Sequence, residues 1–163
     1  MYLLFGMMRN LNDKTGRYFD EFEVGQTFIH QAAKTITRAE HERFCELTMN
    51  YHPLHWDENY AKSSEFGRIV VVGTYVASIA VGLSVPDISA QAIANLDYEK
   101  IEHHAPVFIG DTLRAETEIL EVKGSRSKPD RGVIFVETRV FNQDNLKVLS
   151  LRRHVLIPKL EKK

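Results

Sequence analysis

The second half of the chain alternates apolar and polar positions, which is the pattern of strands that have one buried face. Residues 111–122, DTLRAETEILEV, show it most clearly. From Leu113 to Ile119 every second side chain falls on one face, and the charged side chains fall on the other. This period of two predicts a half-buried strand, whose apolar face needs a covering layer from elsewhere in the chain.

Four further segments are predicted to be strands, which makes about five in all. Residues 132–141 and 147–157 are rich in β-branched side chains and are separated by the turn-forming sequence NQDN, so they predict an antiparallel hairpin. Residues 26–37 and 91–104 are the other two predicted strands.

A continuous apolar stretch precedes most of these strands. Residues 69–85, IVVVGTYVASIAVGLSV, are apolar on nearly all sides of a helix, which predicts a long central helix over about residues 70–84. Spanning a bilayer takes about 20 apolar residues, and this stretch is shorter and is interrupted by glycine, serine and threonine. It therefore predicts the buried core helix of a soluble domain, and no membrane is expected as a partner.

Two shorter helices are predicted before the central one. Thr37 and Glu40 form a capping-box pattern at the start of the first, which is expected to stop near Met49. Asp57 is suited to cap the second, and Gly67 marks its end. The segment between the two helices is therefore expected to be a loop.

This order of elements is a strand, short helices, a long helix and then several antiparallel strands. The predicted fold class is α+β, with a curved antiparallel sheet wrapped around one long helix. A chain of 163 residues with 44% hydrophobic content is large enough for one such core. We assign residues 1–16 to an N-terminal extension and residues 17–160 to a single domain.

Composition narrows the partners and the location. The 21 basic and 22 acidic residues give a net charge of −1 at pH 7 without a long run of like charges, so nucleic acid is not expected as a partner. The single cysteine, Cys45, excludes an intrachain disulfide and is predicted to be a buried apolar residue. The N-terminal sequence MYLLFGMM lacks the basic region and cleavage site of a signal peptide, which favours a cytoplasmic location.

Candidate chemistry gathers in the loop between the two short helices. It contains Asn50, His52 and His55, and Pro53 prevents the chain from continuing as a helix there. A histidine is suited to move a proton near neutral pH. His52 and His55 span a proline and do not lie on a helix with metal-ligand spacing, so no metal site is expected.

The same loop carries a family resemblance. The motif of the MaoC-like dehydratases, a hot-dog-fold family that includes the (R)-specific enoyl-CoA hydratases, reads approximately T-G-D-x-N-P-L-H-x-D. It is followed by Phe-Gly and by I-V-H-G ahead of the central helix. This chain resembles it with T-M-N-Y-H-P-L-H-W-D over residues 48–57, then Phe66 and Gly67, and V-V-V-G ending at Gly73.

The likeness extends over about residues 17–158. Residues 85–116 are similar to the branch of the family that hydrates mesaconyl-type CoA thioesters. The resemblance implies a hot-dog fold and a reversible addition of one water across an enoyl thioester. CoA is part of that substrate, and no separate cofactor is expected.

The family chemistry implies roles for particular residues. In the family an aspartate and the motif histidine hold the water, and they correspond to Asn50 and His55 here. A backbone amide at the start of the central helix polarises the thioester carbonyl, and Gly73 is placed to present it. Four further residues are expected to contact the substrate: His52, Asp57, Phe66 and Arg68.

Three positions depart from the family pattern. Asn50 replaces the aspartate, and an amide can orient water but cannot accept a proton at neutral pH. His52 replaces an asparagine and Val72 replaces the histidine before the glycine. Either His55 works alone, helped by His52 or Asp57, or the activity is altered or lost.

Two other functions stay open. A non-catalytic acyl-CoA-binding protein would tolerate Asn50 and Val72. A hot-dog thioesterase usually has an acidic residue near the central helix, and residues 70–84 contain no Asp or Glu, which argues against it. A homodimer or a dimer-based oligomer is expected, because a curled sheet leaves a strand edge and an apolar face uncovered.

Several further residues are candidate substrate contacts or surface residues. A second carboxylate on a mesaconyl-type substrate would need a cation, for which Arg68 and Arg152 are candidates. Residues 123–128, KGSRSK, are a candidate contact for the CoA phosphates, or else a solvated turn. His103 and His104 are interpreted as surface residues.

Overall fold

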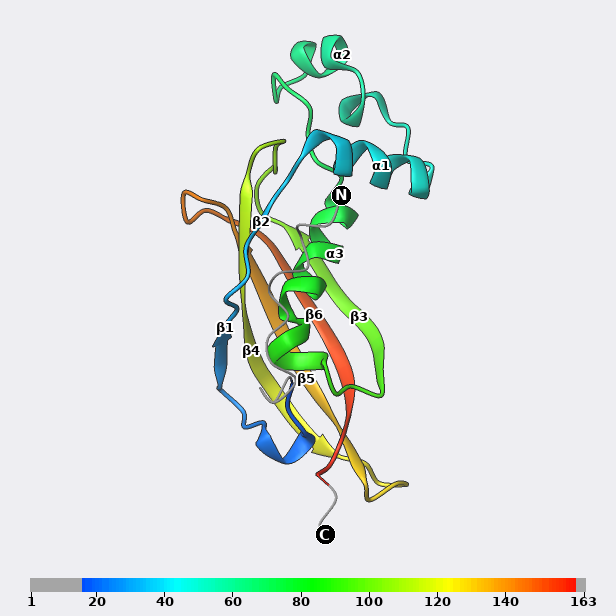
Figure 1. Ribbon diagram of the computed structural model, residues 1–163, viewed down its shortest axis with the longest axis vertical. Coiled ribbons are helices and arrows are strands. Elements are labelled where there is room, and N and C mark those ends of the chain that lie inside the picture. The colour runs from blue at the N-terminus through cyan, green and yellow to red at the C-terminus, as the bar shows by residue number, and fades with distance from the viewer. Residues whose placement is uncertain (1–15, 161–163) are drawn as a thin grey trace, which may run out of the picture.

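The computed structural model describes residues 16–160, and its centre is an antiparallel sheet with the helix α3 lying along one face (Figure 1). From edge to edge the strands are ordered β1-β4-β5-β6-β3, and β2 also pairs with β4. The strands are β1 Thr27–Ile29, β2 Lys34–Thr35, β3 Ala94–His103, β4 Thr112–Gly124, β5 Arg131–Phe141 and β6 Lys147–Pro158. The predicted α+β class and the predicted hairpin, which is β5 and β6, are confirmed.

The described residues also form three α-helices: α1 Arg38–Thr48, α2 Glu58–Ser63 and α3 Gly73–Ser84. Both predicted N-terminal caps are confirmed, but α2 ends at Ser63 and not at Gly67, which was predicted to mark its end. The Thr37 hydroxyl accepts a hydrogen bond from the Glu40 N–H at the start of α1. The Asp57 carboxylate accepts from two backbone N–H groups at the start of α2. Helices α1 and α2 lie together at one end of the sheet (Figure 1).

The predicted strand over residues 26–37 was wrong in being continuous, because it divides into β1 and β2. The break includes His30, whose buried ring is hydrogen-bonded away from the ladder to Asp87 and Thr117. The central helix also begins three residues later than predicted. Val70 to Val72 run extended instead, since Val70 bridges to Phe108 and the Val71 N–H donates to the Val107 carbonyl.

Side chains on the sheet face that α3 covers form the core. In β4 the face predicted to be buried is buried from Leu113 to Ile119, so the register read from the alternation is confirmed. One apolar cluster joins β4 to β6 with Val76, Ala80 and Leu83 of α3. A second lies under Ile88 and Ile134 beyond the end of α3.

Helices α1 and α3 each bury one side and expose the other. In α1 the buried positions are His41 and Cys45, one turn apart, so Cys45 is buried as predicted. In α3 the side that faces away from the sheet, including Thr74, Ser78 and Gly82, is exposed. The described residues therefore cover α3 on one side, where the predicted sheet packs against it.

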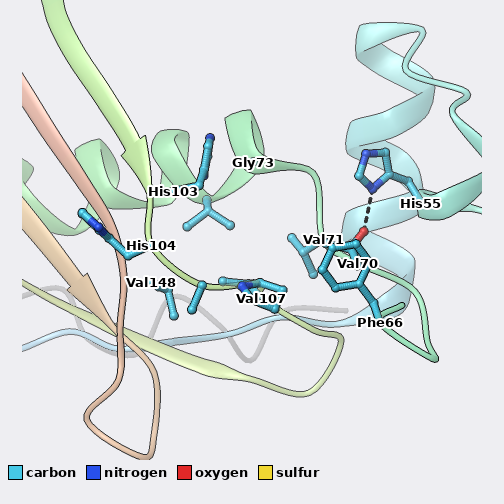
Figure 2. Close-up of a pocket in the computed structure, with 12 residues that line it drawn as sticks. His55, Phe66, Val70, Val71, Gly73, His103, His104, Val107 and Val148 are labelled. Carbon is cyan, nitrogen blue, oxygen red and sulfur yellow. Dashed lines mark hydrogen bonds between the residues drawn. The ribbon is translucent and has the colours of Figure 1, made fainter. Parts of the chain in front are cut away.

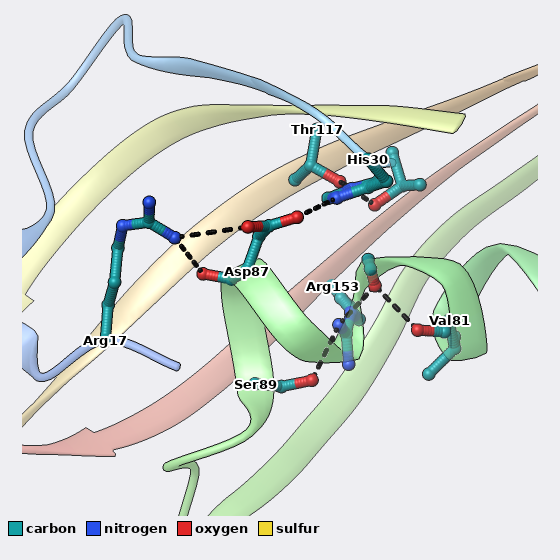
Figure 3. Close-up of polar contacts among 9 residues, drawn as sticks. Arg17, His30, Val81, Asp87, Ser89, Thr117 and Arg153 are labelled. Atoms are coloured by element: carbon teal, nitrogen blue, oxygen red, sulfur yellow. Dashed lines mark hydrogen bonds and ion pairs between the residues drawn. The ribbon is translucent and has the colours of Figure 1, made fainter. Parts of the chain in front are cut away.

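Polar contacts fix the far end of α3 to the sheet (Figure 3). His30 lies between Asp87 (Nδ1 to Oδ2, 2.8 Å) and Thr117 (Nε2 to Oγ1, 2.8 Å). The buried Arg153 donates to the hydroxyls of Ser84 and Ser89, and burial lowers its pKa. His30 and Thr117 are 4% and 0% exposed, so this Thr–His–Asp array is closed to a substrate and has a structural role.

The predicted N-terminal extension, residues 1–16, lies outside the described residues except for Gly16. No helix within residues 16–160 is long and apolar enough to cross a membrane.

Candidate active site

A cavity of about 430 Å³ opens beside the start of α3. Its walls are mainly apolar, and its lining includes His55, Phe66, Gly73, His103 and His104. In Figure 2 His55 lies at one side of this cavity and the two other histidines lie at the other. The structure thus brings together three of the predicted site residues, namely His55, Phe66 and Gly73.

His55 is held in one tautomer by the backbone. It ends a short 3-10 turn, Pro53–His55, and its Nδ1 lies 2.6 Å from the carbonyl oxygen of Val70. Because a carbonyl oxygen only accepts, Nδ1 carries the hydrogen and donates it. The neutral ring therefore leaves Nε2 without a hydrogen, and this nitrogen can accept a proton from a ligand in the cavity.

The start of α3 presents free backbone amides at the same cavity. Val72 is the N-cap, and it has no side-chain acceptor to cap the helix. The N–H groups of Gly73 and Thr74 donate to no acceptor within the described residues. A helix N-terminus with free amides stabilises negative charge, and Gly73 is where a developing oxyanion would meet it.

The space for a side chain at position 73 is limited by a neighbouring ring. A Cβ atom added there would lie 2.5 Å from Cε1 and 2.7 Å from Nε2 of His103. The ring of His103, at the end of β3, is therefore packed directly against the first residue of α3. The other histidine of this wall, His104, is hydrogen-bonded through Nε2 to the Ser150 hydroxyl (2.9 Å).

Both of these histidines are exposed, as their interpretation as surface residues implied, yet both line the cavity. Sequence reasoning missed this because their place in the site comes from long-range pairing. The contact between Val71 and Val107 brings the segment after β3 against the segment before α3. The available signal was their position directly before Ala105 and Pro106 at the end of a predicted strand.

His41 is a further residue that the sequence did not single out. It is fully buried in α1, and its Nε2 accepts a hydrogen bond from the Val72 N–H (3.0 Å). Its ring lies 6.1 Å from that of His55, and its Nδ1 has no partner in the described chain. Burial, and next the charge of His55, lower the pKa of His41 to about 4. The only local signal was its spacing of four residues from Cys45.

The other loop residues lie around the cavity and do not line it. Trp56 Nε1 donates to the Asn50 carbonyl (3.0 Å), and the Asn50 side chain lies at the hydrogen-bond limit from the His52 N–H (3.5 Å). The ring of His52 is 5.8 Å from that of His55, and its Nδ1 accepts from a backbone amide. The side chain of Asp57 is occupied in capping α2.

Neither arginine predicted for a second carboxylate lines the cavity beside α3. Arg68 lies flat on the Phe108 ring, 3.6 Å from its centroid, and lines a neighbouring cavity of about 300 Å³ with Arg38 and Lys62. Arg152 is paired with Glu137 on the sheet (2.8 Å). Within residues 16–160 no group of three or more His, Cys, Asp or Glu side chains is arranged to hold a metal ion.

Comparison with known proteins gives one family and several relatives. The model of the MaoC like domain family matches residues 21–140. A mesaconyl-CoA hydratase of Cereibacter sphaeroides is 33% identical over 149 residues, which are 91% of this chain and 43% of that protein. An (R)-specific enoyl-CoA hydratase of Aeromonas caviae is 30% identical over 121 residues, covering 74% of this chain and 84% of that protein.

A solved structure supports the fold. A Mycobacterium tuberculosis protein described as having a double hotdog fold aligns with a TM-score of 0.83, at 22% identity, over 91% of this chain and 46% of its own. The predicted hot-dog architecture is therefore confirmed. The chain spans less than half the length of the mesaconyl-CoA hydratase it matches.

Proposed function

Since the chain belongs to the MaoC-like domain family, we propose that it is a hydro-lyase that reversibly hydrates a 2-enoyl-CoA thioester. One observation carries the proposal: the proton-accepting Nε2 of His55 and the uncapped amides at Gly73 belong to one largely apolar cavity. The names of the relatives support the same reaction class.

The reaction needs one base and one oxyanion site. His55 Nε2 takes a proton from water as the water oxygen bonds to Cβ of the enoyl group, and electrons shift onto the thioester oxygen. The Gly73 N–H stabilises the resulting enolate, helped by the helix dipole. The imidazolium then returns its proton to Cα, so the net change is the addition of one water.

We assign Asn50, in the loop beside the cavity, to hold the water, because its amide can both donate and accept hydrogen bonds. It cannot act as a base at neutral pH. His52, whose ring neighbours that of His55, is another polar side chain near this position. The apolar walls exclude bulk water, which strengthens the interactions of the charged intermediate.

We propose more specifically that the substrate is a mesaconyl-type CoA thioester. Its second carboxylate needs a basic partner, and the basic side chains that line the cavity, apart from His55, are His103 and His104. We therefore assign to these two histidines, at the end of β3, the role considered above for Arg68 or Arg152. Arg68 and Lys62 of the neighbouring cavity are then available for the phosphates of CoA.

The alternative is a non-catalytic acyl-CoA-binding protein, favoured by Asn50 and Val72 at positions where the family motif has an aspartate and a histidine. We assign the active form to a homodimer in the cytoplasm.

Crotonyl-CoA and mesaconyl-CoA, each mixed with the protein, distinguish the functions. A hydratase removes the enoyl absorbance without releasing thiol, a thioesterase releases thiol, and a binding protein does neither. If the enoyl absorbance stays unchanged with both substrates, the proposal is overturned. Faster turnover of mesaconyl-CoA would support a mesaconyl-type substrate. Equal turnover of the two substrates would remove the reason to propose that His103 and His104 bind a second carboxylate.

A further inference from the structure

We propose that His41 is a positioning residue, which aims the backbone amides at the start of α3 by accepting the Val72 N–H. This inference rests on the hydration activity proposed above and adds to it a residue outside the family motif. His41 lies on α1, 31 residues before its partner, and it is screened from solvent behind the cavity.

The hydrogen bonds of three successive peptides show what the contact does. The Val71 N–H donates to the Val107 carbonyl (2.8 Å), and the Val72 N–H donates to Nε2 of His41 (3.0 Å). The next N–H, that of Gly73, has no acceptor in the described chain. Two anchored peptides therefore precede the free amide, and they fix the direction in which it points.

An ordinary helix cap would not leave this arrangement. A Ser, Thr or Asp at the N-cap would bond to the N–H of the second or third helical residue, and would bring a competing oxygen next to the Gly73 amide that a thioester oxygen needs. Val72 has no such group. His41 reaches the preceding peptide from another helix, so the start of α3 is held while its amides stay free.

Stability alone does not account for a histidine here. Its Nε2 satisfies the buried Val72 N–H and lies 3.6 Å from Sγ of Cys45, but its own Nδ1–H is buried without a partner among residues 16–160. An apolar side chain would remove that unsatisfied group and create another at Val72, so the number of unsatisfied groups is the same either way. With a histidine at position 41, the Val72 N–H at the start of α3 has an acceptor, and the unsatisfied group is the Nδ1–H of His41 instead.

The protonation state of His41 agrees with this role. Burial, and then the charge of His55, lower its pKa to about 4, so the ring is neutral at neutral pH. A neutral ring can keep Nε2 as an acceptor, whereas a protonated ring would place an N–H against the Val72 N–H.

The test compares two substitutions at position 41. His41→Phe keeps a ring in the buried site but removes the acceptor. His41→Gln keeps an acceptor oxygen on a side chain of similar reach. Ile134→Val, in the second apolar cluster, is the control for a general loss of stability. For each protein we would measure kcat and KM with crotonyl-CoA, unfolding by urea, and exchange of the Val72 amide by NMR.

We expect His41→Phe to lower kcat at least ~10-fold and to change KM less than about 2-fold. Removing a whole oxyanion donor lowers kcat by ~10²–10³-fold, and a misdirected donor should lose a part of that effect. The Val72 amide should exchange faster, and His41→Gln should recover most of kcat. Ile134→Val should leave kcat unchanged. An active wild type whose His41→Phe variant keeps its kcat would overturn the inference alone. A His41→Gln variant as slow as His41→Phe would do the same, while an inactive wild type would overturn the proposed function and this inference with it.

Discussion

The carbonyl oxygen of Val70 decides which nitrogen of His55 can act as a base. It accepts a hydrogen bond from Nδ1 (Nδ1 to O, 2.6 Å), so the neutral ring has no hydrogen on Nε2. That His55 is the candidate proton-transfer group was read from the motif, because Pro53 and His55 lie in one short loop, and His55 does line the cavity. Its tautomer was not, because the acceptor lies 15 residues away in the chain.

Asn50→Asp tests whether an acid–base group is absent from the site. A carboxylate at position 50 would add a proton acceptor beside the loop histidines, and we expect the hydration rate to rise by about 10²-fold. Asn50→Ala should lower the rate instead, since it removes the proposed water holder. The rate is read from the loss of enoyl absorbance, and a rate that neither substitution changes would exclude position 50 from the reaction.

His41 predicts how stability depends on pH. Its pKa is about 4 in the folded protein against an ordinary value of 6.5, so in the window between them the unfolded chain binds the proton and the folded chain does not. Its contribution is therefore complete above pH 6.5 and is lost as the pH falls toward 4. A difference of this size corresponds to about 3 kcal/mol.

Urea unfolding at about pH 7.5 and about pH 4.5 measures this effect. We expect the wild type to lose about 2–3 kcal/mol more than His41→Phe between these two conditions, because other groups titrate alike in both proteins. Equal losses would show that His41 does not resist protonation in the folded state.

Elements were predictable wherever the pattern is local. The alternation from Leu113 to Ile119 gave the buried face of β4 correctly, and Thr37 and Asp57 marked two helix starts. The break between β1 and β2 was not predictable, because the partners of His30 lie 57 and 87 residues away. The start of α3 was placed early for the same reason, since the bridge from Val70 to Phe108 is a long-range contact.

Gly73→Ala tests the packing at the start of α3. The new methyl group would lie 2.5 Å from the His103 ring, which is exposed and can move, so we expect a change in stability under about 1 kcal/mol. The displaced ring would fill part of the cavity and lower kcat/KM for crotonyl-CoA.

A double-mutant cycle with His103→Ala separates the clash from other effects. If the clash is the cause, the double variant should be no slower than His103→Ala alone. Losses that simply add would contradict this explanation and point to a direct effect on the Gly73 amide.

On the scale of the whole molecule, β3 is an edge strand whose side chains are exposed along nearly its full length. Leu96, Tyr98 and Ile101 are 51%, 51% and 41% exposed, and the adjoining side of α3 is also uncovered by the described residues. Unpaired edges with apolar side chains favour association with another chain. The sequence could predict that such an edge exists, but which strand forms it depends on sheet order.

We expect sedimentation to give a mass near twice 18.7 kDa at micromolar concentration. Tyr98→Lys should shift the protein toward the monomer, because it places a charge on the exposed edge. Leu47→Lys is the matched control, since Leu47 is an exposed apolar residue of α1 (75%) away from β3. A wild-type mass near 18.7 kDa would contradict the dimer.

The central claim is that His55 is the base of an enoyl-CoA hydratase site. The most direct measurement is kcat for crotonyl-CoA hydration by the wild type and by His55→Ala, with circular dichroism to confirm that the variant is folded. The account predicts that the wild type consumes the enoyl group without releasing thiol and that His55→Ala is slower by at least about 10²-fold. Equal rates for the two folded proteins would contradict it.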